Sequence, residues 1–152
     1  MDMMQTIYAR AGSDRQRIAF PEAEEEKTLL AVREALDKGL CRALLVGDGA
    51  AIEAAAARHG IDISDAQVFD AGDPEVLQGL CEEYASINQM FSVKSLLRKC
   101  RDPLYTALIL EALDRVDATF AGLLHTTGDV ILAGQMIVGL QEGVTTVSSI
   151  GI

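Results

Sequence analysis

The sequence predicts an α/β fold, a three-layer α/β/α arrangement with a mainly parallel sheet, and two observations support this prediction. Short apolar runs alternate with segments of helical periodicity along the chain, which is the order of βαβ crossovers. Hydrophobic residues make up 49% of the chain and aromatic residues only 5%, so small aliphatic side chains must form the core. The length of 152 residues suits one domain. We therefore expect a single α/β domain over residues 17–152, preceded by an N-terminal extension over residues 1–16.

The first half of the chain contains three strand-like runs, each followed by a helix signal. The runs "RIAF", "CRALLVGD" and "AQVFDAG" predict strands at residues 17–20, 41–48 and 66–72. The acidic residues 24–26 face the positive end of the first helix dipole, and glycines at 39 and 60 mark helix ends. Asp73 and Pro74 supply the cap and first residue of the third helix.

The second half continues this alternation. A basic helical segment covers residues 92–101, and Asp102 with Pro103 begins the next helix by the same cap-and-proline device. We then expect a fourth strand over residues 116–124, a helix over residues 126–140, and a final strand or its start over residues 144–152.

Charge and cysteine usage narrow the class of function. The formal net charge of −10 opposes nucleic-acid binding, but it leaves room for a small anion held by short-range donors. The three cysteines are far apart and lack metal-ligand spacing, so we expect small buried side chains in a reduced cytoplasm, and no metal centre. No apolar run is long enough to cross a membrane. A cytoplasmic protein without nucleic-acid or membrane partners is therefore expected.

The segment "HTTGD", His125 to Asp129, is the main candidate site. It follows a predicted strand and begins a helix, and ligands of parallel α/β sheets collect at such carboxyl ends of strands. Thr126 and Asp129 fit a capping box, so a well-capped helix without a ligand is the alternative interpretation. Gly128 favours a ligand slightly, because glycine in a first turn is costly unless the backbone must be approached closely.

The helix that follows has almost no polar face. Between Val130 and Leu140 only Gln135 is strongly polar, so another layer, domain or subunit is expected to cover this helix. The partner is expected to be a second copy of the chain or a missing C-terminal half.

Two other segments are weaker candidates. Lys94 and Arg98 lie four residues apart in a basic stretch and share a helix face, where they can hold a phosphate or nucleotide tail, although a solvated face is the more ordinary interpretation. The turn "GDGAAI", with Asp70 about twenty residues later, imitates a dinucleotide-binding fingerprint but lacks its third glycine.

The chain resembles the phosphate acetyl/butyryltransferase family, the phosphotransacetylases, from about residue 17 to residue 149. The similar stretches, in order, are "RIAFPEAEEEKTLLAVREA", "ALLVGDGAAIEAAA", "RDPLYTALILEALDRVDATFAGLLHTTGDV" and "EGVTTVSS". The resemblance implies reversible acyl transfer between coenzyme A and phosphate, with coenzyme A as substrate and no tightly bound cofactor. It also implies that this chain is the N-terminal portion of a protein about twice as long.

The resemblance further implies a cleft in which Thr126, Thr127 and the backbone near Gly128 hold phosphate oxygens, with Ser148 and Ser149 lining the same pocket. It assigns no catalytic residue to this chain, because the groups credited with thiol activation lie in the absent half. Where the family usually carries two arginines, this chain has Leu132 and, near the second position, Asn88. A non-catalytic anion-binding, regulatory or partner module on the same fold is therefore the alternative.

Overall fold

The computed structural model describes residues 2–148, and within them one parallel sheet has the strand order β3-β2-β1-β4. The strands are β1 (Gln16–Phe20), β2 (Cys41–Gly47), β3 (Gln67–Asp70) and β4 (Ala118–Thr119). The helices are α1 (Met3–Ser13), α2 (Glu26–Asp37), α3 (Gly49–His59), α4 (Pro74–Ile87), α5 (Val93–Lys99), α6 (Pro103–Ala112) and α7 (Thr127–Ile137).

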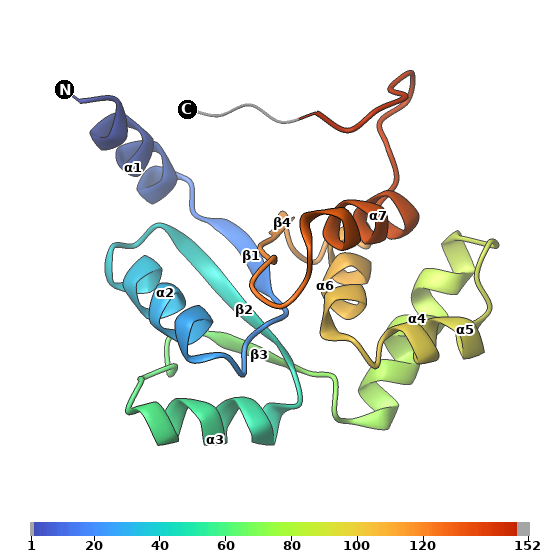
Figure 1. The fold of residues 1–152 in the computed structure, drawn as a ribbon, viewed down its shortest axis with the longest axis horizontal. Coiled ribbons are helices and arrows are strands. Elements are labelled where there is room, and N and C mark those ends of the chain that lie inside the picture. Colours follow the sequence, from blue (N-terminus) through green and yellow to red (C-terminus); the bar gives the residue numbers. More distant parts are fainter. Residues whose placement is uncertain (1, 149–152) are drawn as a thin grey trace.

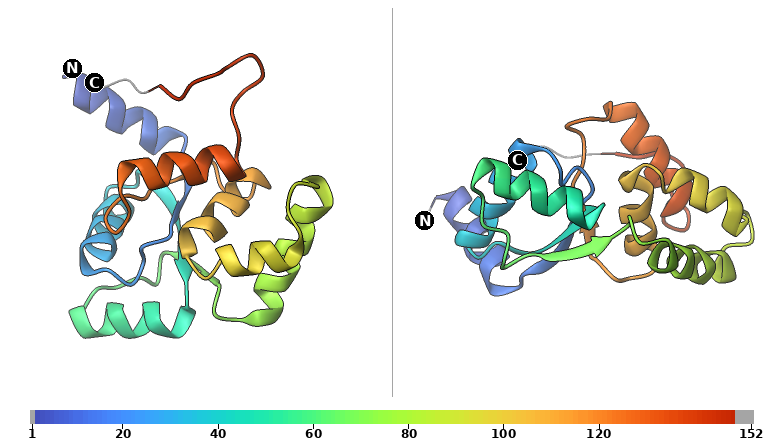
Figure 2. Two further views of the ribbon diagram at one scale, coloured as in Figure 1. Left: turned by 45° about the vertical axis from the view of Figure 1, so that its right-hand side comes forward. Right: turned by 90° about the horizontal axis from the view of Figure 1, so that it is seen from below.

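The predicted three layers are confirmed. Figures 1 and 2 show α2 and α3 on one side of the sheet and α4 to α7 on the other. Successive residues of β2 point to opposite faces, so Leu45 joins the core cluster under α2 and α3, whereas Val46 joins the cluster under α4 to α7. Ala19 and Phe20 of β1 divide in the same way. Burial on both faces explains why these strands are almost entirely apolar.

Local signals set the helix ends as the sequence predicts. The Asp73 carboxylate accepts hydrogen bonds from the first-turn amides of α4, and Asp102 does the same for α6. Each has proline as the first residue of its helix, where no amide hydrogen is needed. Gly39 and Gly60 end α2 and α3 with φ near +65°, a conformation that costs glycine least. The three cysteines are free thiols and buried, as expected.

The fourth strand differs from the prediction, because it spans only Ala118–Thr119 rather than residues 116–124. After Phe120, whose amide still donates to Ala19, the chain leaves the sheet. Gly122 turns with φ of 126°, and the next amides bind a side chain instead of a neighbouring strand. The physical reason is therefore a competing acceptor, described below.

Three further boundaries depart from the sequence expectations. The expected extension contains α1, which buries no residue and therefore showed no apolar stripe in the sequence. Helix α7 ends at Ile137 rather than residue 140, because Gly139 takes φ of 85° just beyond it. Residues 144–148 of the expected final strand are not in a strand, and residues 149–152 lie outside the described part of the chain.

Helix α7 is only half covered. Ala133 and Ile137 pack into the core, whereas Ile131, Leu132 and Val138 are 40%, 57% and 44% exposed. An aliphatic face of this kind remains open to contact with further protein.

Candidate functional site

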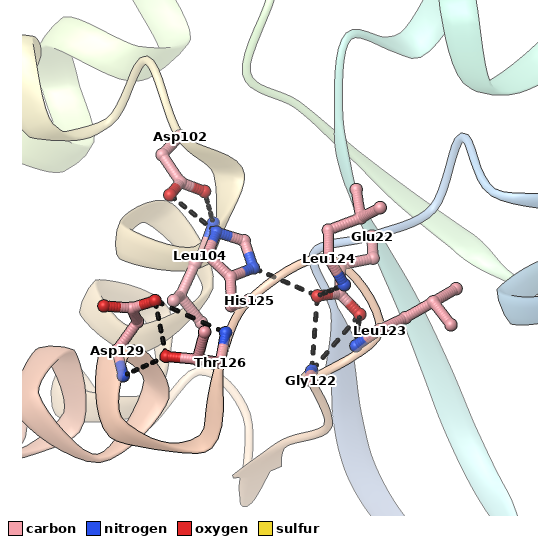
Figure 3. Close-up of polar contacts among 9 residues, drawn as sticks. All are labelled: Glu22, Asp102, Leu104, Gly122, Leu123, Leu124, His125, Thr126 and Asp129. Carbon is pink, nitrogen blue, oxygen red and sulfur yellow. Dashed lines mark hydrogen bonds and ion pairs between the residues drawn. The ribbon is translucent and has the colours of Figure 1, made fainter.

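The segment His125–Asp129 lies at the carboxyl edge of the sheet, where β1 and β4 end side by side. Figure 3 shows that the Glu22 carboxylate, just after β1, faces the loop that follows β4. It accepts hydrogen bonds from the backbone amides of Gly122, Leu123 and Leu124, with donor–acceptor distances of 2.8 to 3.3 Å. The Nδ1 atom of His125 lies 3.0 Å from the same carboxylate. One buried side chain therefore fixes the whole approach to the candidate turn.

The buried carboxylate of Glu22 stays ionised because its donors outweigh its desolvation. Burial alone would raise the pKa of Glu22. The hydrogen bonds from His125 and the three backbone amides lower it further than burial raises it, so the pKa lies below its ordinary value. Four donors on one carboxylate make a rigid, charged anchor.

His125 bridges two carboxylates. Its Nε2 atom lies 2.8 Å from Asp102, which also caps α6 through the amide of Leu104 at 3.0 Å (Figure 3). Glu22 and then Asp102 raise the pKa of His125 against the opposing effect of partial burial. Both ring nitrogens face acceptors, so the imidazolium suits both contacts as a double donor. His125 therefore positions the turn between β1 and α6, and its ring nitrogens are already engaged.

The predicted capping box is confirmed. The Thr126 hydroxyl accepts from the Asp129 amide at 3.2 Å and lies 2.6 Å from the Asp129 carboxylate, which also accepts from the Thr126 amide at 3.3 Å. These contacts use the Thr126 side chain for helix initiation. The next two amides, of Thr127 and Gly128, and the Thr127 hydroxyl donate no hydrogen bond within residues 2–148. They are the donors of the turn that remain available to a ligand.

A hollow of about 390 Å³ lies beside this turn. Its lining combines His125, Leu124 and Arg101 with carboxylates; the other lining residues are Pro21, Glu22, Glu24, Glu25, Asp102 and Pro103. Of the turn itself only His125 lines this hollow, so the free donors of Thr127 and Gly128 do not face it, and its acidic lining does not favour an anion inside.

The other expected site residues are distributed as follows. Ser148 is exposed and makes no hydrogen bond to the turn, and Ser149 lies outside the described residues. Figure 1 shows the chain after α7 leaving from the far end of that helix. Lys94 and Arg98 share one hollow, as their spacing predicts, with Arg101 beside them.

Two aspartate side chains of this chain already accept hydrogen bonds from the backbone amides at the start of α3. The Asp70 carboxylate accepts from the amides of Gly49 and Gly72, each at 2.9 Å, and Asp48 caps the helix through Ala51. A pyrophosphate would need those amides and would meet two negative charges, so this geometry opposes the dinucleotide interpretation.

Within residues 2–148, no group of three or more His, Cys, Asp or Glu side chains is arranged to hold a metal ion. No helix in that range is long and apolar enough to span a membrane.

Glu22 and Asp102, which hold the candidate turn in place, are the site residues that sequence reasoning missed. Both were visible only as helix-start residues, after "FP" and before Pro103. The missing information was the strand order, because β1 and β4 are neighbours although about a hundred residues separate them. A carboxylate placed immediately after a buried parallel strand was the available signal.

Solved phosphotransacetylases share this fold. EutD phosphotransacetylase from Staphylococcus aureus and a phosphotransacetylase from Streptococcus pyogenes each match with a TM-score of 0.81, at 18% and 16% identity. Each match covers 96% of this chain and 46% of the other. The fold thus defines an α/β protein built like the corresponding half of those structures.

Sequence comparison gives the family. A phosphate acetyltransferase from Clostridium acetobutylicum is 30% identical over 150 residues, which are 97% of this chain and 45% of the relative. A phosphate acetyltransferase from Treponema pallidum is 31% identical over 152 residues, 98% of this chain and 45% of the relative. The family described as phosphate acetyl/butaryl transferase matches residues 2–152, and the chain belongs to it. The chain spans about half the length of these curated relatives and corresponds to their N-terminal portion.

Proposed function

We propose that this chain provides part of the site of a phosphate acyltransferase, which converts acyl-CoA and phosphate into acyl phosphate and coenzyme A. The family match over residues 2–152 carries this proposal. The free donors at the start of α7 support it, because acyl transfer needs hydrogen-bond donors for phosphate and for the developing oxyanion.

Each residue of the turn has a separate task in this proposal. The Thr127 hydroxyl and the amides of Thr127 and Gly128 bind phosphate oxygens at the positive end of the α7 dipole. Thr126 and Asp129 hold the first turn of the helix in shape. His125 fixes the turn to Glu22 and Asp102 and adds a positive charge nearby. Ser148 and Ser149 are assigned to the same site by the family resemblance alone.

The reaction also requires a base that takes the proton of the attacking thiol. His125 is held between two carboxylates, so we assign no base within this chain. A segment corresponding to the remaining half of the relatives supplies that base. It covers the exposed aliphatic face formed by Ile131, Leu132 and Val138, and it turns the open edge of the sheet into a cleft.

The test is thioester formation from coenzyme A and acetyl phosphate, followed by absorbance. The 152-residue chain is assayed alone and mixed with the C-terminal half of a relative such as the Clostridium acetobutylicum enzyme. We expect turnover only in the mixture, and slower turnover when the chain carries Thr127→Val. Turnover by the chain alone would contradict the proposal that the other half supplies the catalytic base. Parallel assays with butyryl phosphate give the acyl preference, and sedimentation shows whether a second copy replaces the other half.

Two observations favour a second candidate, a non-catalytic module that senses an anion or pairs with a partner chain. Asn88, near the position of a family arginine, donates to the Tyr84 hydroxyl at 2.8 Å and so serves the core rather than a ligand. Leu132, at the other arginine position, is an exposed aliphatic side chain. Calorimetric titration with phosphate, acetyl phosphate and coenzyme A discriminates the two functions. Absence of binding to all three, with retained association to the second half, would favour the partner module.

A further inference from the structure

A second hollow, of about 480 Å³, lies between α4 and α5 and gathers three cations. Lys94, Arg98 and Arg101 line it together with Gln78, Val93 and Leu97. Lys94 and Arg98 are one helical turn apart on α5, and Arg101 follows directly after the end of that helix. The lining contains no carboxylate, although the chain as a whole has a formal net charge of −10.

These three cations are also unpaired within residues 2–148. None of them forms an ion pair, whereas Arg17, Arg33 and Arg115 each bind a carboxylate. Glu82 of α4 is engaged by another lining residue, because it accepts from the Gln78 amide at 2.7 Å. Carboxylates lie near Arg101 only on its other side, in the hollow beside His125, so the cations repel one another in this hollow and a bound anion would relieve that repulsion.

A larger hollow at the amino ends of the strands provides the contrast. It is lined by four arginines, but Arg17 there is paired with Asp114 and Asp117, and Arg115 with Glu83. Two of the four charges are thus neutralised, and Asp65 also lines that hollow, whereas Arg15 and Arg42 form no ion pair within residues 2–148. The hollow between α4 and α5 lacks such neighbours, so it is the better place for an external anion.

The lining also indicates what kind of anion fits. Two guanidinium groups favour bidentate contacts with phosphate oxygens, and the lysine ammonium adds a third contact. Val93 and Leu97 offer an apolar surface beside them, on which a flat ring system can lie. We propose that Lys94, Arg98 and Arg101 bind the phosphate groups of a nucleotide that carries two or more phosphates.

Arg101 connects this hollow to the candidate site. It also lines the hollow beside His125, and the adjacent Asp102 is the residue that binds His125. A long ligand anchored by its phosphorylated nucleotide can therefore extend toward the start of α7. Coenzyme A has this form, with a 3′-phosphate and a diphosphate at one end and a thiol at the end of a flexible arm. The assignment of coenzyme A rests on the proposed function, whereas nucleotide binding does not.

Calorimetric titration of the 152-residue chain tests this inference. The probes are adenosine 3′,5′-bisphosphate, coenzyme A, dephospho-coenzyme A and inorganic phosphate. We expect the bisphosphate to bind, and coenzyme A to bind more tightly than its dephosphorylated form. In Lys94→Gln/Arg98→Gln the dissociation constant for the bisphosphate rises at least tenfold. The matched control is Arg10→Gln/Arg58→Gln, which leaves binding unchanged. It removes the same charge from two exposed arginines on α1 and α3 that form no ion pair within residues 2–148.

Absence of bisphosphate binding would overturn the inference, and so would either of the next two results. Equal weakening by the two double variants would mean that only net charge matters. Equal affinity for inorganic phosphate and the bisphosphate would mean that the hollow binds phosphate without recognising a nucleotide. Circular dichroism melting of both variants checks that they are folded. Nucleotide binding without thioester formation in the mixed-half assay would contradict the proposed function alone, because the titration does not depend on turnover.

Discussion

The Nδ1 atom of His125 and the Oε1 atom of Glu22 lie 3.0 Å apart, although 103 positions separate the two residues in the sequence. This contact joins the end of the first strand to the turn that follows the last one. Asp102 holds the other side of the imidazole ring at 2.8 Å. The shape of the candidate site therefore depends on one histidine and two carboxylates that sit behind it.

Replacing Glu22 by Gln should destabilise the fold. The neutral amide weakens the contact with His125 and those with three backbone amides, and losing a hydrogen bond to a charged group costs about 2 kcal/mol. The measurement is the free energy of unfolding in urea. Glu24→Gln is the control, because Glu24 is exposed and makes no hydrogen bond within the described residues. Equal effects of the two substitutions would contradict the role given to Glu22.

The contribution of His125 to stability should fall as pH rises. Its pKa is raised above the ordinary 6.5, first by Glu22, so the stabilisation is complete below 6.5 and disappears as pH passes the raised pKa. The pKa of Glu22 is lowered below 4.5, so its contribution is complete above 4.5 and disappears as pH falls. Both contributions are present between these values. The difference in unfolding free energy between the unmodified chain and His125→Gln should therefore be larger at pH 6 than at pH 9. A difference that does not change with pH would show that His125 is held as a neutral ring.

Thr126 and Thr127 should respond in opposite ways to replacement by Ala. Thr126→Ala removes the cap of α7 and should lower the unfolding free energy by about 1 kcal/mol. Thr127→Ala should leave stability within about 0.5 kcal/mol, because its hydroxyl makes no bond within residues 2–148. In the mixed-half transfer assay, Thr127→Ala should be the variant that raises the KM for acetyl phosphate, whose phosphate oxygens the Thr127 hydroxyl is proposed to bind. A stable Thr126→Ala protein and an unfolded Thr127→Ala protein would reverse these assignments.

Asp70 should matter for stability and not for cofactor binding. Asp70→Ala leaves the amides of Gly49 and Gly72 without their acceptor and should cost about 1 to 2 kcal/mol. Urea unfolding measures the loss, with Glu53→Ala on the exposed side of α3 as control. Fluorescence titration with NADH should show no saturable binding to the unmodified chain. Saturation would restore the dinucleotide interpretation.

Leu132→Asp should weaken association with the second half without destabilising the isolated chain. The side chain is 57% exposed, so the isolated chain should lose less than about 0.5 kcal/mol of stability. The same charge placed on the face proposed to meet the second half should weaken that association at least tenfold, as measured by titration calorimetry. The control is Glu53→Gln on α3. Unchanged affinity would move the contact surface away from α7.

Much of the fold could be predicted because the signals were local. Asp73 and Asp102, each before a proline, specify helix starts within three residues, and an apolar run such as β2 indicates burial on both faces. The capping box at Thr126 and Asp129 is local in the same sense. These features depend on neighbours in the chain, so the sequence contains them directly.

The features that sequence reasoning missed are long-range. The length of β4 depends on Glu22, a competitor about a hundred residues away, for the amides of residues 122–124. The role of His125 depends on the order of strands in the sheet, which periodicity does not reveal. Helix α1 buries nothing, so no apolar stripe could indicate it.

The pairing of β1 with β4 has a consequence for how the protein is made. On the ribosome, Arg17 and Glu22 leave the exit tunnel about a hundred residues before their acceptors and donors at 114–125. Contacts that span such long separations slow folding, because the intervening chain must be closed into a loop first. One edge of the first strand can therefore pair early with β2, at residues 41–45, whereas its other edge stays unpaired until residues 118–119 of β4 have been synthesised.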